Sequence, residues 1–442
     1  MKLKIYHTND IHSHLHHYVR ISRYLQHVRP TLTHPSLYVD LGDHVDLSAP
    51  ITEGTMGKRN ITLMNEAGVD VATIGNNEGM TISHEALNAL YDDATFTVTC
   101  SNLFDLETGV LPNRFVQSHI RHIDGVRCLF IGVTAPFTPF YSALNWRVTD
   151  PFEAIQHEIE ANNGQYDVLI ILSHVGIFFD ERLCDEMPEI DIIFGSHTHH
   201  HFEDGMMRNG VLMAAAGKYG YYLGEVDLEI IDGNVVSKHA RLHTLASMPE
   251  VETHFEAEGR QCLDQCIIQR PVTLSRAMDR ITQATHMLAE SIHDFTQAEC
   301  TLINAGLLVK GVNNAPVTAF DIHQMLPHPI NTVTIQIPGF ILKQVIIESQ
   351  KQAYMHERAQ GLGFRGNIFG GYILYGMGYI ASQQRYFVQG EEIDDERIYT
   401  LGTVDMYTFG RYFPMLKDLP TTYLMPEFLR DIYQSKLLIS TF

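Results

Sequence analysis

Residues 3–12 read LKIYHTNDIH, a strand-like run of alternating apolar and polar residues that ends abruptly at Asp10 and His12. The same pattern recurs in SLYVDLGD (36–43), which ends at Asp43, and in VDVATIGN (69–76), which ends at Asn76. Helix-like stretches at 18–30 and 59–68 lie between these runs. Strands that alternate with helices predict an α/β sandwich built on mostly parallel sheets.

This pattern continues to residue 231 and then changes. Near-continuous apolar runs at 125–134, 166–176 and 190–200 are typical of buried strands, and 210–231 is predicted to form two more. These elements predict a first domain over 1–245. Residues 246–270 are polar, charged and rich in helix formers, so we expect a linker helix there. Mixed helices and strands then predict a second, α+β domain over 271–442.

Composition argues against several classes of function. The formal charge of −21 argues against a nucleic-acid partner, and phosphate chemistry in such a chain would need bound cations. The sequence has no apolar run of about 18 residues that would span a membrane, and its N-terminus lacks an apolar signal segment. The six cysteines form no C-x-x-C pair. We expect a cytoplasmic protein, and the oligomeric state stays open.

Side chains of the metal-ligand type follow five strand-like runs. They are Asp10 and His12, Asp43, Asn76, His174, and His197 with His199. Singly, an Asp or Asn after a strand is usually a turn residue or a helix cap, and one H-x-H triplet means little among 25 histidines. Here five strand-like runs end in such side chains, and the ends lie on the edge where open α/β sheets bind ligands. Together they predict a single metal site. Imidazoles, carboxylates and a carboxamide suit Zn, Mn, Fe or Co, and Asp43 has two oxygens with which to bridge two ions.

The series D-x-H, G-D, G-N-x-E, H and G-x-H-x-H at these positions resembles the calcineurin-like dimetal metallophosphoesterases. The opening HTNDIHSHL and the large second domain narrow the resemblance to the 5′-nucleotidase family, in its cytoplasmic bacterial branch. The resemblance implies a four-layer α/β/β/α sandwich with a nucleotidase-type α+β C-terminal domain. It also implies a metal-bridging water that attacks phosphate monoesters, with nucleotides as the expected substrates. It implies two divalent ions, one on Asp10, His12, Asp43 and His199 and one on Asp43, Asn76, His174 and His197.

Asn77 departs from the family pattern, which has G-N-H-[DE] at this place. The family's histidine stabilises charge beside the phosphate or protonates the leaving oxygen, and a general acid of this kind typically contributes about 10²–10⁴-fold. Asn77 can donate only a neutral hydrogen bond, and Met80 stands where nucleotidases usually place the aspartate partner. His44, directly after the bridging Asp43, is the candidate for an extra polar group near the phosphate.

The resemblance also implies substrate-binding residues in the second domain. NAGLLVKG (304–311) keeps Asn304 and has Lys310 in place of the family's arginine, and PHPIN keeps Asn331. VDMYTFGRYF (404–413) has Met406 and Tyr407 near the place of a stacking aromatic. Because the base-stacking residues are altered, the resemblance supports a phosphate ester as the substrate more strongly than it supports a nucleotide.

Two alternatives stay open. One is a phosphodiesterase that acts on cyclic or dinucleotide esters. The other is a non-catalytic, metal-dependent ligand-binding protein, which the missing His–Asp dyad favours.

Overall fold

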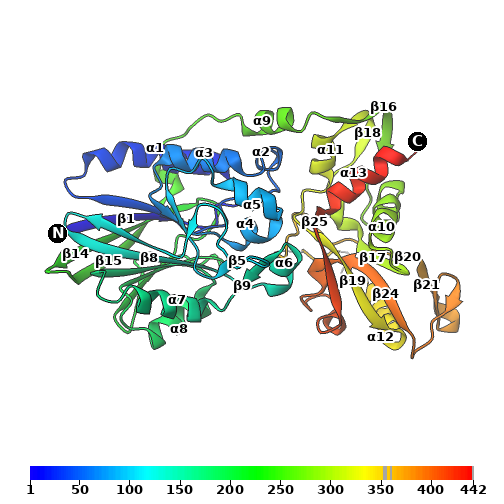
Figure 1. Cartoon of the computed structure of the whole chain (residues 1–442). Coiled ribbons are helices and arrows are strands. Elements are labelled where there is room, and N and C mark those ends of the chain that lie inside the picture. The colour runs from blue at the N-terminus through cyan, green and yellow to red at the C-terminus, as the bar shows by residue number, and fades with distance from the viewer. Residues whose placement is uncertain (352–355, 359–360, 441–442) are drawn as a thin grey trace. The chain divides into compact units, whose positions relative to one another are not determined.

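A computed structural model describes residues 1–351, 356–358 and 361–440. The chain divides into two compact units, Met1–Glu258 (unit 1) and Gly259–Phe442 (unit 2), each with its own buried hydrophobic core (Figure 1). In the described residues, no helix combines the length and the apolar character that a membrane span requires. The predicted mixed α/β class is confirmed.

Unit 1 is built on two large sheets. The first has the order β15 (Asn234–Thr244), β14 (Tyr222–Ile231), β1 (Lys2–Thr8), β2 (Ser36–Asp40), β3 (Val71–Ala72), β4 (Thr97–Thr99), β6 (Phe115–Val116). The second has the order β12 (Met206–Arg208), β13 (Val211–Ala214), β11 (Ile192–Gly195), β10 (Val168–His174), β8 (Val126–Thr134), β7 (Ser118–Ile123). The central strands of both sheets run parallel, as alternating strands and helices require.

The two sheets pack face to face and are covered by helices on both outer faces. Ile5 and Val39 from the first sheet share one buried cluster with Phe130 and Ile170 from the second. Helices α1 (Leu15–Val28) and α3 (Lys58–Ala67) lie over the first sheet, and α7 (Pro151–Ala161) and α8 (Ile177–Glu186) lie over the second (Figure 1). The result is the predicted order of layers, helix, sheet, sheet, helix.

Shorter elements complete unit 1. Strands β5 (Leu103–Asp105) and β9 (Trp146–Val148) pair as a separate small sheet. The short helices are α2 (Pro50–Gly54), α4 (Asn76–Thr81), α5 (His84–Leu90) and α6 (Thr138–Ala143). Helix α4 begins at Asn76, directly after the turn that ends β3, so the predicted strand end is also a helix start.

The linker helix predicted over 246–270 is shorter than expected. Helix α9 covers only Phe255–Cys262, a single turn of 3₁₀ helix precedes it at Leu245–Ser247, and Cys266–Leu274 forms strand β16. The sequence CIIQRPVTL contains β-branched residues and an internal proline, which favour an edge strand over a helix. Strand β16 pairs with β18 (Val312–Thr318), a partner distant in sequence that helix propensity could not reveal.

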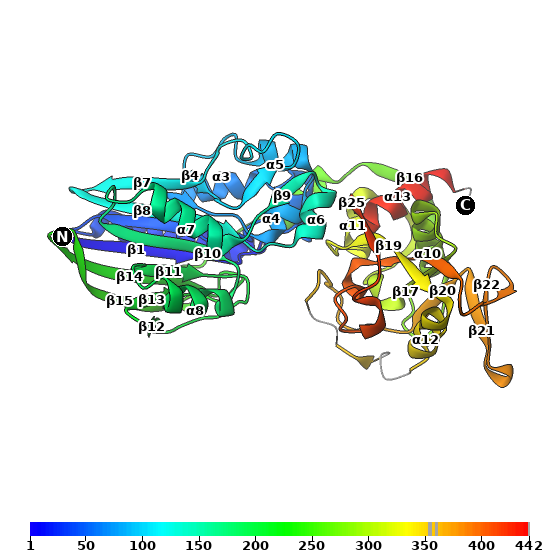
Figure 2. The same cartoon turned by 60° about the horizontal axis from the view of Figure 1, so that its bottom comes forward.

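Unit 2 is centred on a five-stranded sheet in the order β20 (Tyr372–Tyr375), β17 (Cys300–Asn304), β24 (Ile398–Val404), β19 (Asn331–Pro338), β25 (Thr421–Phe428). Its helices are α10 (Gln283–Thr296), α11 (Ala319–Met325), α12 (Gly339–Ser349) and α13 (Leu429–Ile439). Strands β21 (Met377–Ile380), β22 (Arg385–Val388) and β23 (Glu391–Glu392) form a small antiparallel sheet, part of which is visible in Figure 2. This is the predicted α+β organisation.

Candidate active site

The seven side chains predicted as metal ligands all follow strands of unit 1. Asp10 and His12 come after β1, Asp43 after β2, and Asn76 after β3 in the first sheet. His174 is the last residue of β10, and His197 and His199 follow β11 in the second. Since carboxyl ends of parallel strands meet at one edge of a sheet, the two sheets bring these residues to a common place.

The backbone at this place is strained in a consistent way. Five of the predicted ligands have positive φ angles, which L-residues rarely adopt: Asp10 (51°), His12 (45°), Asp43 (49°), His197 (70°) and His199 (59°). Each such residue costs on the order of 1 kcal/mol, and such strain tends to concentrate at functional sites. The rest of the fold therefore holds these side chains at a measurable energetic cost.

Two groups of these side chains have the spacing of metal ligands: Asp10 with His12 and His199, and Asp10 with Asp43 and His174. The Nε2 atom of His174 lies 3.4 Å from Oδ1 of Asp43, and Nε2 of His199 lies 3.5 Å from Oδ1 of Asp10. The Nε2 atom of His12 lies 3.6 Å from Oδ2 of Asp43. Both groups include Asp10, and Asp43 reaches imidazoles on both sides.

Three buried atoms in these groups have no hydrogen-bond partner among the described residues: Asp10 Oδ1, His12 Nε2 and His174 Nε2. Buried polar atoms are almost always satisfied, so unpaired ones that face each other call for a missing partner. Divalent ions bind imidazole nitrogen and carboxylate oxygen at about 2.0–2.2 Å, and ions in the two groups would satisfy all three atoms. The residues present therefore fit a metal centre.

Neighbouring groups hold the rings of His174 and His197 in place. The Nδ1 atom of His174 lies 2.7 Å from the carbonyl oxygen of Leu41, which leaves Nε2 directed at Asp43. The Nδ1 atom of His197 lies 2.8 Å from the side-chain oxygen of Asn76, and its backbone N–H donates to Oδ2 of Asp10. Hydrogen bonds of this kind fix the orientation of imidazole ligands.

Burial and the two carboxylates set the electrostatics of the site. Burial lowers the pKa of His197 to about 4 and that of His199 to about 3, which keeps both imidazoles neutral at pH 7. Burial also disfavours the charged form of His174, but Asp43 and Asp10 outweigh it and raise its pKa to about 10. Burial raises the pKa of Asp10. Burial also raises the pKa of Asp43, but His174 and His12 outweigh it and hold that pKa well below its usual range, so Asp43 keeps a negative charge where a cation would bind.

Gly75 and Gly42 allow the ligand loops to approach each other. A Cβ on Gly75 would overlap the Oδ1 and N atoms of Asp43 and lie 2.6 Å from Cε1 of His174. A Cβ on Gly42, whose φ is +83°, would overlap the backbone of Gly75. The two glycines of the G-D and G-N motifs are therefore needed for close approach of the strand ends, and Gly42 also for its backbone angle.

Glu78 and Asp46 support the site, although sequence reasoning gave neither a role. The carboxylate of Glu78 accepts hydrogen bonds from the backbone N–H groups of Asp43, Gly75 and Val45, at 2.9, 2.9 and 2.8 Å. Glu78 therefore ties the loop after β2, which holds Asp43, to the turn after β3, which holds Gly75 and Asn76. An Oδ2 atom of Asp46 lies 3.3 Å from Nδ1 of His12. The acid in G-N-N-E and the acid three residues after Asp43 were the available signals.

Asn77 lies within this site. Its backbone N–H donates to Oδ1 of Asp43 at 2.7 Å, and its side-chain nitrogen lies 2.9 Å from Nδ1 of His12. His44 packs elsewhere in the interior, edge-on to Tyr18 with ring centroids 4.4 Å apart and with Nδ1 3.2 Å from the Asn60 side-chain nitrogen. Burial lowers the pKa of His44 to about 3. A role for His44 near the phosphate stays a prediction.

The predicted substrate-binding residues of unit 2 are placed mostly in its interior. Tyr407 donates to the side-chain oxygen of Asn304 at 2.8 Å, and the Asn304 amide donates to the carbonyl of Phe369. Asn331 donates to the carbonyls of Pro426 and Glu427. Met406 belongs to the hydrophobic core, and Lys310 is exposed. These contacts give the four buried residues structural roles, and substrate binding stays a prediction for all five.

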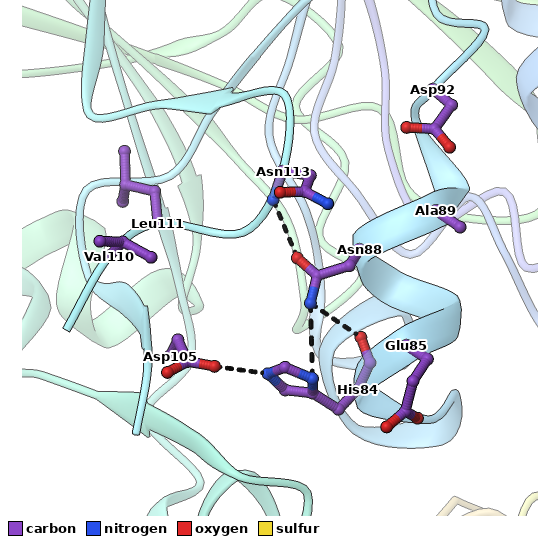
Figure 3. Close-up of a pocket in the computed structure, with 9 residues that line it drawn as sticks. All are labelled: His84, Glu85, Asn88, Ala89, Asp92, Asp105, Val110, Leu111 and Asn113. Atoms are coloured by element: carbon purple, nitrogen blue, oxygen red, sulfur yellow. Dashed lines mark hydrogen bonds and ion pairs between the residues drawn. The ribbon is translucent and has the colours of Figure 1, made fainter. Parts of the chain in front are cut away.

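A cavity of about 400 Å³ lies in unit 1 and is lined by none of the predicted site residues (Figure 3). His84 lies on its wall, with Nε2 2.8 Å from Oδ2 of Asp105 and its ring stacked on Trp146. The side-chain oxygen of Asn88 accepts from the backbone N–H of Asn113. Because none of its lining residues is a predicted metal ligand, this cavity is distinct from the candidate metal centre (Figure 3).

Comparison with known proteins agrees with this geometry. Residues 3–201 match the family of calcineurin-like phosphoesterases, and residues 266–418 match the 5′-nucleotidase C-terminal domain. The chain is 37% identical over 464 residues to the uncharacterized metallophosphoesterase YunD of Bacillus subtilis, covering 99% of both chains.

Two solved structures have the same fold as the whole chain. A 5′-nucleotidase precursor from Thermus thermophilus aligns with a TM-score of 0.60 and 18% identity, over 99% of this chain and 96% of that one. The NAD nucleotidase NadN of Haemophilus influenzae aligns with a TM-score of 0.65 and 16% identity, over 99% and 96%. At these identities the likeness concerns the fold.

Proposed function

Because this chain belongs to the calcineurin-like metallophosphoesterases that carry a 5′-nucleotidase C-terminal domain, it is a hydrolase of phosphate esters. We propose that it cleaves phosphate monoesters, nucleotides among them, at a centre of two divalent ions. The ligands that we propose are Asp10, His12, Asp43, Asn76, His174, His197 and His199. Asp43 would bridge the two ions, because its carboxylate faces His12 on one side and His174 on the other.

The observation that carries this proposal is the convergence of three unpaired buried atoms, one carboxylate oxygen and two imidazole nitrogens. The fold could have satisfied each of them with an ordinary hydrogen bond, but they face one another instead. When bound there, divalent ions would lower the pKa of water and neutralise phosphoryl charge, which is the chemistry that ester hydrolysis needs.

The protein's own residues would orient these groups and contact the phosphate. Glu78 holds two ligand loops together through three backbone N–H groups, so it keeps Asp43 in position. Asp46 faces Nδ1 of His12 and would fix the tautomer that directs Nε2 towards Asp43. The Asn77 amide lies beside His12 and would donate a hydrogen bond to a phosphoryl oxygen. An amide cannot pass a proton to the leaving group, so we expect good leaving groups to be hydrolysed faster.

The double substitution Asn77→His with Met80→Asp is expected to raise kcat for substrates with poor leaving groups by about 10²-fold, because it adds a general acid beside the phosphate. Both positions lie on α4, three residues apart and thus on one face of the helix. Rates on an alkyl phosphate and an activated aryl phosphate should be compared, with each single substitution as control. If the doubly substituted protein has the same kcat as the unchanged protein on each of the two substrates, proton donation does not limit the rate.

The proposed function is tested with the purified protein supplied with Mn²⁺ or Zn²⁺ and a panel of nucleoside monophosphates, cyclic nucleotides and aryl phosphates. We expect turnover of monoesters, with nucleotides among the substrates. Turnover of cyclic nucleotides alone would support the phosphodiesterase alternative. Tight ligand binding without turnover with either ion would overturn the enzymatic proposal in favour of a metal-dependent binding protein.

A further inference from the structure

Residues 216–219, which we call the rim segment, are tied to both sides of the candidate metal centre. The backbone N–H of Tyr219 donates to the carbonyl of Asp10 at 2.7 Å, and that of Gly217 donates to the carbonyl of His200 at 2.8 Å. The side chain of Asn9 accepts from the N–H of Ala216 and donates to the carbonyl of Gly217. Lys218 therefore lies between two anchored residues, one next to each ligand loop.

Tyr219 carries the strain of this segment and contacts the site directly. Its φ of 62° is in the left-handed region, which is unfavourable for an aromatic residue. Its ring stacks on that of His14 with centroids 4.0 Å apart and meets the ring of His12 edge-on at 5.7 Å. Backbone strain of this kind lowers stability and tends to occur at functional sites. We therefore attribute the strain at Tyr219 to the position that its ring must take beside His12.

The ammonium of Lys218 lies over this ring, 4.7 Å from its centroid. Lys218 has no carboxylate partner among the residues that the structure describes, so this ring is the contact that holds its ammonium. The aromatic face holds the cation without neutralising it.

We propose that Lys218 is a phosphate-binding residue, whose ammonium, held over Tyr219 at the rim of the metal centre, binds a non-bridging oxygen of the substrate's phosphoryl group or of inorganic phosphate. This inference rests on the proposed function. It adds a positive partner for the phosphate at a site where Asn77, beside His12, offers only the hydrogen bond of a neutral amide. Lysine recognises phosphate as a point charge, so no paired geometry is required of it.

The test is the dissociation constant of inorganic phosphate, measured by titration calorimetry on the Mn²⁺-loaded full chain. Lys218→Met is expected to weaken phosphate binding by about 30-fold, as loss of a charged hydrogen bond would. Lys218→Arg should restore most of the affinity, since it keeps the charge. Lys58→Met, which removes an exposed lysine at the start of α3, is the matched control and should bind as the unchanged protein does. The Mn²⁺ content of each variant is measured alongside.

Equal phosphate affinity in Lys218→Met and the unchanged protein, at equal Mn²⁺ content, would overturn the assignment of Lys218. The proposed hydrolysis is judged separately, from turnover of monoesters by the unchanged protein. A protein that binds phosphate through Lys218 but hydrolyses no ester would keep this inference and lose the proposed function. A protein that hydrolyses monoesters but binds phosphate equally well with and without the Lys218 ammonium would keep the proposed function and lose this inference.

Discussion

Asp43→Asn is expected to remove most of the bound metal and to lower kcat/KM for a phosphate monoester by about 10³-fold, which corresponds to roughly 4 kcal/mol of transition-state stabilisation. The reason is that Asp43 faces His12 with one oxygen and His174 with the other. An amide has one oxygen and no charge, so it cannot bridge two cations. The measurement is metal content by mass spectrometry together with steady-state kinetics.

Asp167→Asn is the matched control for this change, because Asp167 also lies in unit 1 but pairs with Arg127 instead of a predicted ligand. It should leave metal content and kcat/KM unchanged. Should Asp43→Asn keep both its metal and its rate, the proposed bridging role of Asp43 would be wrong and the metal centre would have to lie elsewhere.

Gly75→Ala is expected to lower kcat/KM by about 10²-fold, the effect of displacing a catalytic group by about 1 Å. The added methyl group would overlap the Asp43 carboxylate and press on the ring of His174, so one or both must move. The φ of Gly75 is −96°, an ordinary angle for alanine, so any loss of activity reports on space and not on backbone conformation. Kinetics and metal content are measured as for Asp43→Asn.

The control for Gly75→Ala is Gly378→Ala, where a Cβ meets nothing within 4 Å. Circular dichroism and thermal unfolding should show that both variants are folded. A folded Gly75→Ala protein with unchanged metal affinity and rate would mean that the ligand loops adjust freely, contrary to the tight approach seen here.

The clustering of the candidate ligands could be predicted from sequence because each of these side chains ends or follows a strand of the two sheets. The end at which parallel strands meet brings Asp10 and Asp43 together within the first sheet. His174 ends a strand of the second sheet, and it joins them because the two sheets pack face to face. The same reasoning predicted the layered fold, since alternating strands and helices allow few other arrangements.

Positions that depend on contacts between distant parts of the sequence could not be predicted in this way. Lys218 gains its place from hydrogen bonds between residues 216–219 and residues 9–10, which are more than 200 positions apart in the sequence. Strand β16 was mistaken for part of a helix because its partner β18 is distant in sequence. Motif matching located Met406 and Tyr407 by position, but it carries no information on burial, and both side chains are in the core of unit 2.

The central claim is that the clustered carboxylates and imidazoles of unit 1 hold divalent ions that hydrolyse phosphate esters. It is tested most directly by stripping the purified protein with a chelator and titrating Mn²⁺ back while bound ions and the rate of monoester hydrolysis are measured on the same sample. We predict no turnover without metal, and a rate that rises as up to two ions bind per chain. Full turnover by the metal-free protein, or bound ions with every ester left intact, would contradict it.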